Sequence, residues 1–218
     1  MKRFFSNTQL LHHSITLVLL FLAVGCNVVG AVAYKVAGPI PIEAKYTPAK
    51  EPMVVVVERF NAPSSSMTES ETLAREIFRE LSEHEVAQQI DPIMIVSLRD
   101  TDSAKFKKMT VSQIGAAVTA KQVLYVNLTA ASIDSADGGV MFRGTMAGRV
   151  KVIDVATGAT LWPTDAADGY PIAGDIKPTL ASDRATPEAA RLQLIRKMAI
   201  GTARLFYKYQ PDDDMPDQ

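Results

Sequence analysis

Acidic side chains at short spacing, together with one histidine, are the residues of this chain best suited to acid–base catalysis. Asp100 and Asp102 stand in "LRDTDS", and Asp165 and Asp168 stand in "PTDAADG". A pair of carboxylates can supply the general acid and the general base of a hydrolytic reaction. His84 lies among glutamates in "ELSEHEV", which is typical of a solvated helix surface. A carboxylate-dependent hydrolase is therefore one alternative function for this chain.

Other catalytic and cofactor-binding patterns are missing from the sequence. It contains no HExxH, P-loop, GxGxxG or GxSxG motif. One cysteine and three histidines supply few ligands for zinc. We therefore expect no enzymatic activity, no metal and no cofactor. The 23 basic and 24 acidic residues leave no positive excess, so nucleic acid is not an expected partner.

The chain begins with a segment that has the layout of an export signal. Lys2 and Arg3 form a basic start, residues 15–24 are almost wholly apolar, and the only cysteine, Cys26, follows a glycine. The run "LAVGC" that ends at Cys26 resembles a bacterial lipobox, in which the cysteine becomes the acylated first residue of the mature protein. We expect residues 1–26 to be a lipoprotein signal peptide, and a lipid on Cys26 to hold the chain on a membrane.

Two other fates of this segment stay open. A signal peptidase could cut after Gly25 or after residues 31–33, or residues 15–34 could remain as an uncut anchor, because about 20 apolar residues can cross a bilayer. All of these place the folded part outside the cytoplasm, in the cell envelope and facing the periplasm. Asn27 stands where some lipoproteins carry an aspartate that retains them in the inner membrane, so the outer membrane is favoured.

The rest of the chain divides into three parts. Residues 27–51 contain three prolines and no helical period, so we expect a tether. Residues 52–209 have a length and an apolar content that suit a single domain with one core. The tail "QPDDDMPDQ", residues 210–218, is expected to be disordered.

The first half of the domain predicts alternating strands and helices. "MVVVVERF", residues 53–60, has no polar face and predicts a central strand that is covered on both sides. Thr68 and Glu71 have capping-box spacing and predict the start of an amphipathic helix. "IMIVSL" predicts a second strand, joined to the first by a β-α-β crossover. Thr110 and Gln113 predict the start of a short helix.

An antiparallel meander and a long helix follow. Residues 123–131, 140–153 and 160–162 predict three strands, joined by turns at Asp137-Gly138 and Thr157-Gly158. Thr186-Pro187-Glu188 predicts the start of the last helix. The predicted fold class is α+β: a mixed sheet made of a β-α-β-α unit and the meander, then a long C-terminal helix, with helices mainly on one face.

This order of elements resembles one family. The valine strand, the amphipathic helix, "VSQIGAAVTAKQVLYVNL", a meander ending in "VKVIDVATGATLW" and the last helix are similar to envelope lipoprotein domains of the CsgG and LpoB type, and to the amino-terminal domain of TolB. The resemblance implies a non-enzymatic module, either a secretion-pore subunit or an activator of a cell-wall synthase. We therefore expect an accessory binding protein whose partner is an envelope protein. A lipopolysaccharide transport component resembling LptE is the alternative from another class.

Alternation in the meander predicts a candidate partner-binding surface. Every second residue is apolar and would face the helices, so the residues between them would form an open, basic and tyrosine-containing face. The candidates on this face are Tyr125, Asn127, Arg143, Arg149 and Lys151. The connection formed by residues 163–187 is long for a structureless loop, and such loops tend to be functional or disordered. It contributes Tyr170 and Ile172 as exposed apolar anchors.

Overall fold

The computed structural model describes residues 40–59, 67–136, 141–180 and 186–211. The chain separates into one compact unit, Glu43–Lys208, and a second unit made of the residues before and after it. In the second unit, Ile42 and Tyr209 form an antiparallel bridge. The predicted signal peptide with Cys26, the turn at Asp137-Gly138 and nearly all of the predicted tail lie outside the described residues.

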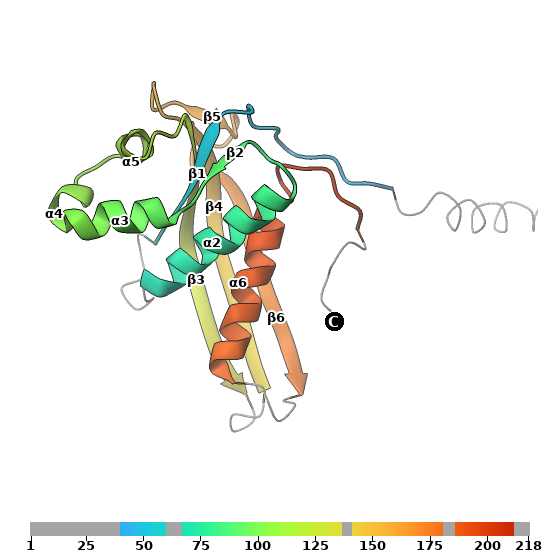
Figure 1. The fold of residues 1–218 in the computed structure, drawn as a ribbon. Helices are drawn as coiled ribbons and strands as arrows, with labels where there is room; N and C mark the ends of the chain where they lie inside the picture. Colours follow the sequence, from blue (N-terminus) through green and yellow to red (C-terminus); the bar gives the residue numbers. More distant parts are fainter. Residues whose placement is uncertain (1–39, 60–66, 137–140, 181–185, 212–218) are drawn as a thin grey trace, which may run out of the picture. The chain divides into compact units, whose positions relative to one another are not determined.

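The larger unit contains a six-stranded sheet (Figure 1). Its strands are β1 (Pro52–Glu58), β2 (Gln88–Ile90), β3 (Gln122–Ala136), β4 (Met141–Asp154), β5 (Thr160–Trp162) and β6 (Tyr170–Leu180). The main path runs in the order β2-β1-β3-β4-β5, and β6 also pairs with β4. β1 is parallel to β2 and β3, whereas β4 is antiparallel to β3, β5 and β6. The predicted α+β class with a mixed sheet is confirmed.

β1 lies in the interior of the sheet, as its valine run predicts. Met53 and Val55 belong to one apolar cluster, and Val54 and Val56 belong to another on the opposite face. All four side chains are buried. A strand without a polar face is stable only where both of its faces are covered, which explains the absence of alternation here.

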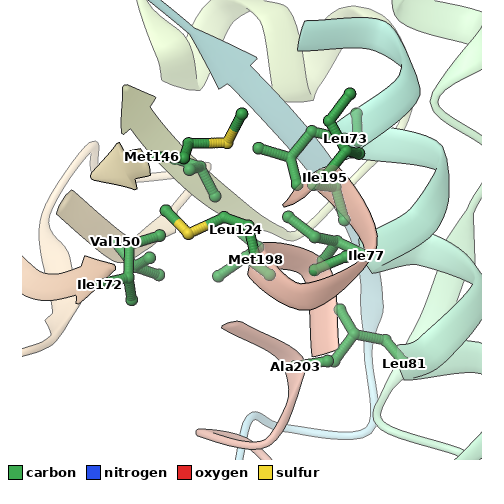
Figure 2. Close-up of a cluster of buried hydrophobic side chains, with 14 of the residues drawn as sticks. Leu73, Ile77, Leu81, Leu124, Met146, Val150, Ile172, Ile195, Met198 and Ala203 are labelled. Atoms are coloured by element: carbon green, nitrogen blue, oxygen red, sulfur yellow. The ribbon is translucent and has the colours of Figure 1, made fainter. Parts of the chain in front are cut away.

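Two long helices, α2 (Met67–Glu83) and α6 (Pro187–Ala203), pack side by side on one face of the sheet (Figure 1). Figure 2 shows side chains from both helices meeting side chains of the strands in the larger cluster. Each fully buried leucine or isoleucine stabilises the fold by about 2 kcal/mol relative to an exposed one. The helices contribute buried side chains at helical spacing to this cluster: Leu73, Ile77 and Leu81 of α2, and Leu194, Ile195 and Met198 of α6.

Three short helices contribute to the cluster on the other face: α3 (Ile93–Thr101), α4 (Ser103–Phe106) and α5 (Val111–Ala117). Ile114 of α5 is buried in this smaller cluster. The Thr110 hydroxyl accepts a hydrogen bond from the Gln113 amide, and the Gln113 side chain accepts one from the Thr110 amide. The predicted short helix and its capping box are confirmed.

The apolar run "IMIVSL" forms helix α3, so the prediction of a strand there is wrong. The Asp91 carboxylate accepts a hydrogen bond from the Ile93 amide at 2.9 Å, which stabilises a helix start directly after Pro92. Ile95 and Leu98 then pack against the smaller cluster. A short apolar run fits a strand and a helix equally well. The crossover itself is confirmed, because β2 precedes this run and is parallel to β1.

The two long helices begin differently from each other. α2 begins at Met67, so Thr68 lies inside its first turn and is not the predicted capping residue. The Thr68 carbonyl already accepts a hydrogen bond from the Thr72 hydroxyl at 2.7 Å. The start of α6 is as predicted, because the Thr186 hydroxyl accepts a hydrogen bond from the Ala189 amide at 3.1 Å and Pro187 opens the helix.

The connection formed by residues 163–187 contains strand β6, so the prediction of a long structureless loop is wrong. Ile172 and Ile176 are buried, and Gly174 stands between them on the face toward α6. A Cβ on Gly174 would lie 3.6 Å from the Met198 backbone, so this side of the strand is in close contact with the helix. Pro171 and Gly174 conceal the alternation of the strand in the sequence, because both residues are uncommon in strand interiors.

The end of the predicted tether, residues 43–51, belongs to the larger unit. The amides of Lys45 and Tyr46 both donate to the Leu205 carbonyl, at 2.8 and 3.1 Å. The Gln122 side chain donates to the Ala49 carbonyl at 3.1 Å. These hydrogen bonds hold the segment along the unit without making it a strand. Among the described residues, no helix is long and apolar enough to cross a bilayer.

Candidate functional site

A groove lies along the outer edge of β1, beyond the end of β2. Its cavity has a volume of about 600 Å³. Apolar side chains of β1, α2, α3 and α4 line it, among them Val55, Val57, Ala74, Ile95, Val96 and Phe106. Its charged side chains come from these elements or from the residues that directly follow β1 and α4: Glu58, Arg59, Glu71, Arg75, Arg99 and Lys107. We call this site the β1 groove.

The β1 groove exists because β2 is much shorter than β1. The parallel register between the two strands ends where Val54 is opposite Ile90. The chain then enters α3 at Ile93, on the side of the smaller cluster. On its other side β1 stays paired with β3 as far as Glu58. The edge of β1 from Val55 onward therefore lies between α2 and the α3–α4 segment.

An ion pair joins the two walls of the groove. Nη2 of Arg99, on α3, lies 2.6 Å from Oε1 of Glu71, on α2. Both side chains are mostly buried, with 18% and 26% of their surfaces exposed, so water screens the pair less than it screens a surface pair. Arg75 and Lys107 also line the groove and are exposed. The rim therefore carries positive charge.

A side chain of the neighbouring strand β3 holds the last residue of β1. The Tyr125 hydroxyl donates to Oε2 of Glu58 at 3.0 Å. Burial, and then the negative charge of Glu58 and the hydrogen bond to it, raise the pKa of the Tyr125 phenol well above its ordinary value. Tyr125 thus stays neutral and holds the Glu58 carboxylate at the groove.

A second ionic cluster ties the groove to both long helices. Arg59 follows β1, and its Nη1 atom lies 3.3 Å from Oε2 of Glu69 on α2. Oε1 of Glu69 lies 3.1 Å from Nε of Arg191 on α6. Arg59 also donates to the Ala131 carbonyl of β3 at 3.2 Å. Charged groups from α2, from α6 and from the residue after β1 thus fix the geometry at one end of the site.

The predicted sheet face brings together four of its five candidate residues. Tyr125 is opposite Lys151, and Asn127 is opposite Arg149, in the antiparallel register of β3 and β4. All four are half-buried, so this face is less open than predicted. Tyr125 packs against the smaller cluster, which explains its burial. Arg149 donates to the Gly169 carbonyl at 3.3 Å.

Arg143 is distant from those four residues along β4, and Tyr170 lies on the opposite face of the sheet. Arg143 is exposed farther along β4, opposite Asp134. Tyr170 is opposite Val150, on the core face of the sheet, and stacks on Trp162 with 5.1 Å between ring centroids. The prediction that Tyr170 and Ile172 are exposed anchors is therefore wrong, because Ile172 is buried and Tyr170 is half-buried in an aromatic cluster.

The residues considered for hydrolysis have other roles or positions. Asp102 accepts a hydrogen bond from the Lys105 amide at 2.9 Å and caps α4. Asp100, Asp165 and Asp168 are exposed. His84 is exposed and stacks on Tyr207 with 3.7 Å between ring centroids. In the described ranges, no three His, Cys, Asp or Glu residues gather into a cluster that could hold a metal ion.

Sequence reasoning did not identify the β1 groove. One signal for it was present, since Glu58 and Arg59 directly follow a buried strand and "LRDTDS" places Arg99 after an apolar run. The length of β2 decides whether the edge of β1 is covered. The sequence of β2, "QQI", has no pattern from which its length could be predicted. The lipidation candidate Cys26 lies outside the described residues.

Comparison with known proteins finds similarity only among solved structures. No protein-family profile and no curated protein matches the chain. The lipoprotein GNA1162 from Neisseria meningitidis is 13% identical, with a TM-score of 0.43, over 66% of this chain and 90% of that chain. A PelC dodecamer from Paraburkholderia phytofirmans is 15% identical, with a TM-score of 0.40, over 75% and 96%. The hypothetical protein CT253 from Chlamydia trachomatis is 11% identical, with a TM-score of 0.36, over 58% and 73%. At these identities and TM-scores, the similarities assign no function to this chain.

Proposed function

We propose that this chain is a membrane-tethered lipoprotein of the cell envelope that acts as a non-enzymatic binding module for an envelope assembly. The observation that carries the proposal is the β1 groove. It combines an apolar lining with a positively charged rim, and an ion pair between Glu71 and Arg99 joins its walls. A preformed concave site with a few placed polar groups is suited to binding.

The sequence supports the envelope part of the proposal. The export-type segment and the lipobox-like run that ends at Cys26 support a location outside the cytoplasm, with the outer membrane favoured. A lipid on Cys26 would fix the domain near a membrane, so its partner would be an envelope protein. A single acyl chain gives weak anchoring, whereas more than one chain gives a stable anchor.

Site-specific photocrosslinking in whole cells tests the binding function. One variant carries a photoreactive amino acid in place of Val96, on the α3 wall of the groove. A control variant carries it in place of Gln193, which is exposed on α6. We expect a discrete crosslinked protein from position 96 and none from position 193. The absence of a crosslink at both positions, or the same set at both, would contradict the proposal.

Metabolic labelling with a fatty-acid probe tests the tether separately. The wild-type chain should take up the label, and Cys26→Ser should stay unlabelled and unprocessed. Label that persists on the serine variant would rule out acylation at Cys26. An unlabelled wild-type chain that remains in the membrane fraction would support the uncut anchor instead.

A further inference from the structure

We infer that the β1 groove binds an extended acidic peptide segment of a partner protein, which adds a strand to the free edge of β1. The inference rests on the proposed function, because it names the ligand class of the binding module. Three features of the groove carry it: the direction of the β1 backbone groups, the apolar walls on both sides, and the charge of the rim.

The backbone of β1 offers hydrogen-bonding groups to the groove. The Glu51 carbonyl accepts from the Gln88 amide at 3.2 Å, whereas the Pro52 carbonyl accepts from the Lys121 amide at 2.7 Å. Neighbouring residues of a strand direct their backbone N–H and C=O groups to opposite sides. The backbone groups of the odd-numbered residues of β1 therefore point toward the β2 side. On that side, no described strand lies opposite Val57. Its N–H and C=O groups are therefore available to an added strand.

The walls of the groove would cover both faces of such a strand. Ala74 of α2 lies on the side of the larger cluster, and Ile95 and Phe106 lie on the side of the smaller one. Because side chains of a strand alternate between its two faces, an added peptide would bury residues against α2 and against the α3–α4 segment. This geometry matches an extended peptide better than a helix, which could not reach the edge of β1 with its backbone.

The charges of the groove favour an acidic peptide. Its two carboxylates are engaged, since Glu58 accepts from the Tyr125 hydroxyl and Glu71 pairs with Arg99. Arg75 and Lys107 are exposed at the rim, and neither takes part in an ion pair among the described residues. Acidic side chains of the peptide would therefore meet positive charge that no ion pair of the described residues compensates.

Selection from a phage-displayed library of random ten-residue peptides tests the inference. The bait is the purified full-length chain in detergent micelles. Enriched peptides should combine acidic with β-branched or other apolar residues, and they should slow amide hydrogen exchange at Val57. Alternate N-methylation of the peptide backbone should weaken binding about tenfold or more, because it removes two or three strand hydrogen bonds.

Matched charge variants locate the binding site. Arg75→Glu combined with Lys107→Glu reverses the rim and should weaken binding about tenfold. Arg196→Glu combined with Lys121→Glu makes the same change of charge at exposed positions outside the groove lining and should bind like the wild type. The inference is overturned if no peptide is enriched, if both double variants bind alike, or if N-methylated peptides bind fully. It is also overturned if a second copy of the chain protects Val57 instead, which would show as dimerisation in sedimentation.

The two tests can fail independently. The purified chain could bind peptides while position 96 gives no crosslink in cells. This result would refute the proposed function and retain the inference that the groove binds acidic, extended peptides. A discrete crosslink in cells, together with a peptide selection that enriches nothing, would retain the binding module and refute strand addition.

Discussion

Gly148 and Asn127 are in such close contact that a Cβ on Gly148 would lie 2.7 Å from the Asn127 carbonyl oxygen. The two residues belong to neighbouring strands, β4 and β3, next to the register shift between Leu128 and Ala130. The oxygen is a backbone atom, so it can move aside only if the strand itself shifts. Glycine at position 148 is thus required by the close approach of β3.

The contact predicts the effect of alanine at this position. Gly148→Ala should lower the free energy of unfolding by about 1–3 kcal/mol, the range for overpacking in a buried site. Gly201→Ala is the control, because nothing lies within 4 Å of its added Cβ and Gly201 is in α6. It should be neutral or stabilising by up to about 1 kcal/mol. Urea denaturation of the three proteins measures both values, and equal stability of the two variants would contradict the packing described here.

The ion pair between Glu71 and Arg99 should contribute measurably to stability. A double-mutant cycle with Glu71→Ala and Arg99→Ala should give a coupling energy of about 1 kcal/mol, since both side chains are largely buried. The pair between Lys208 and Glu43, with 57% and 73% of the side-chain surfaces exposed, is the control and should couple by less than about 0.5 kcal/mol. Equal coupling in both cycles would show that the groove walls are not held by this contact.

The raised pKa of the Tyr125 phenol predicts that the protein loses stability at alkaline pH. The pKa of Tyr125 is raised in the folded protein, so above about pH 10 the unfolded chain releases the phenol proton while the folded protein keeps it. Its contribution to stability is therefore complete below pH 10 and falls as the pH rises further. Tyr125→Phe should flatten the pH dependence of the unfolding free energy between pH 9 and about 11. Identical slopes for the two proteins would mean that Tyr125 titrates normally.

Charge reversal on the sheet face tests the surface predicted from the meander. Lys151→Glu should change stability by less than about 0.5 kcal/mol, whereas Arg149→Glu should cost about 1 kcal/mol, because Arg149 also donates to the Gly169 carbonyl. If this face contacts the partner, the crosslink from position 96 should weaken in Lys151→Glu. An unchanged crosslink in a stable variant would remove the face from the binding site.

The parts of the fold that could be predicted are those with local chemical signals. The valines of β1 predict a strand that is covered on both faces, and they are buried. The hydroxyls of Thr110 and Thr186 accept the helix-capping hydrogen bonds expected from their positions. The Thr157-Gly158 turn is confirmed, with Gly158 at φ +73° and Asp154 accepting from the Thr157 amide. Each of these features depends on residues within a few positions of one another.

The features that were missed depend on distant contacts. β6 is stabilised by pairing with β4 and by the approach of α6 at Gly174, and neither is visible in the residues around Pro171. The β1 groove depends on where β2 ends and on how α2 and α3 flank the uncovered edge. The alternation of side chains on the sheet face was predicted correctly. The prediction that this face is open was wrong, because Tyr125 packs under the short helices.

The yield of the position-96 crosslink in cells, compared between charge variants, tests the central claim most directly. The claim is that this chain binds its envelope partner through the β1 groove. Arg75→Glu with Lys107→Glu should reduce the yield about tenfold at equal protein level, and Arg196→Glu with Lys121→Glu should leave it unchanged. A yield that falls equally in both variants, or in neither, would contradict binding through this groove.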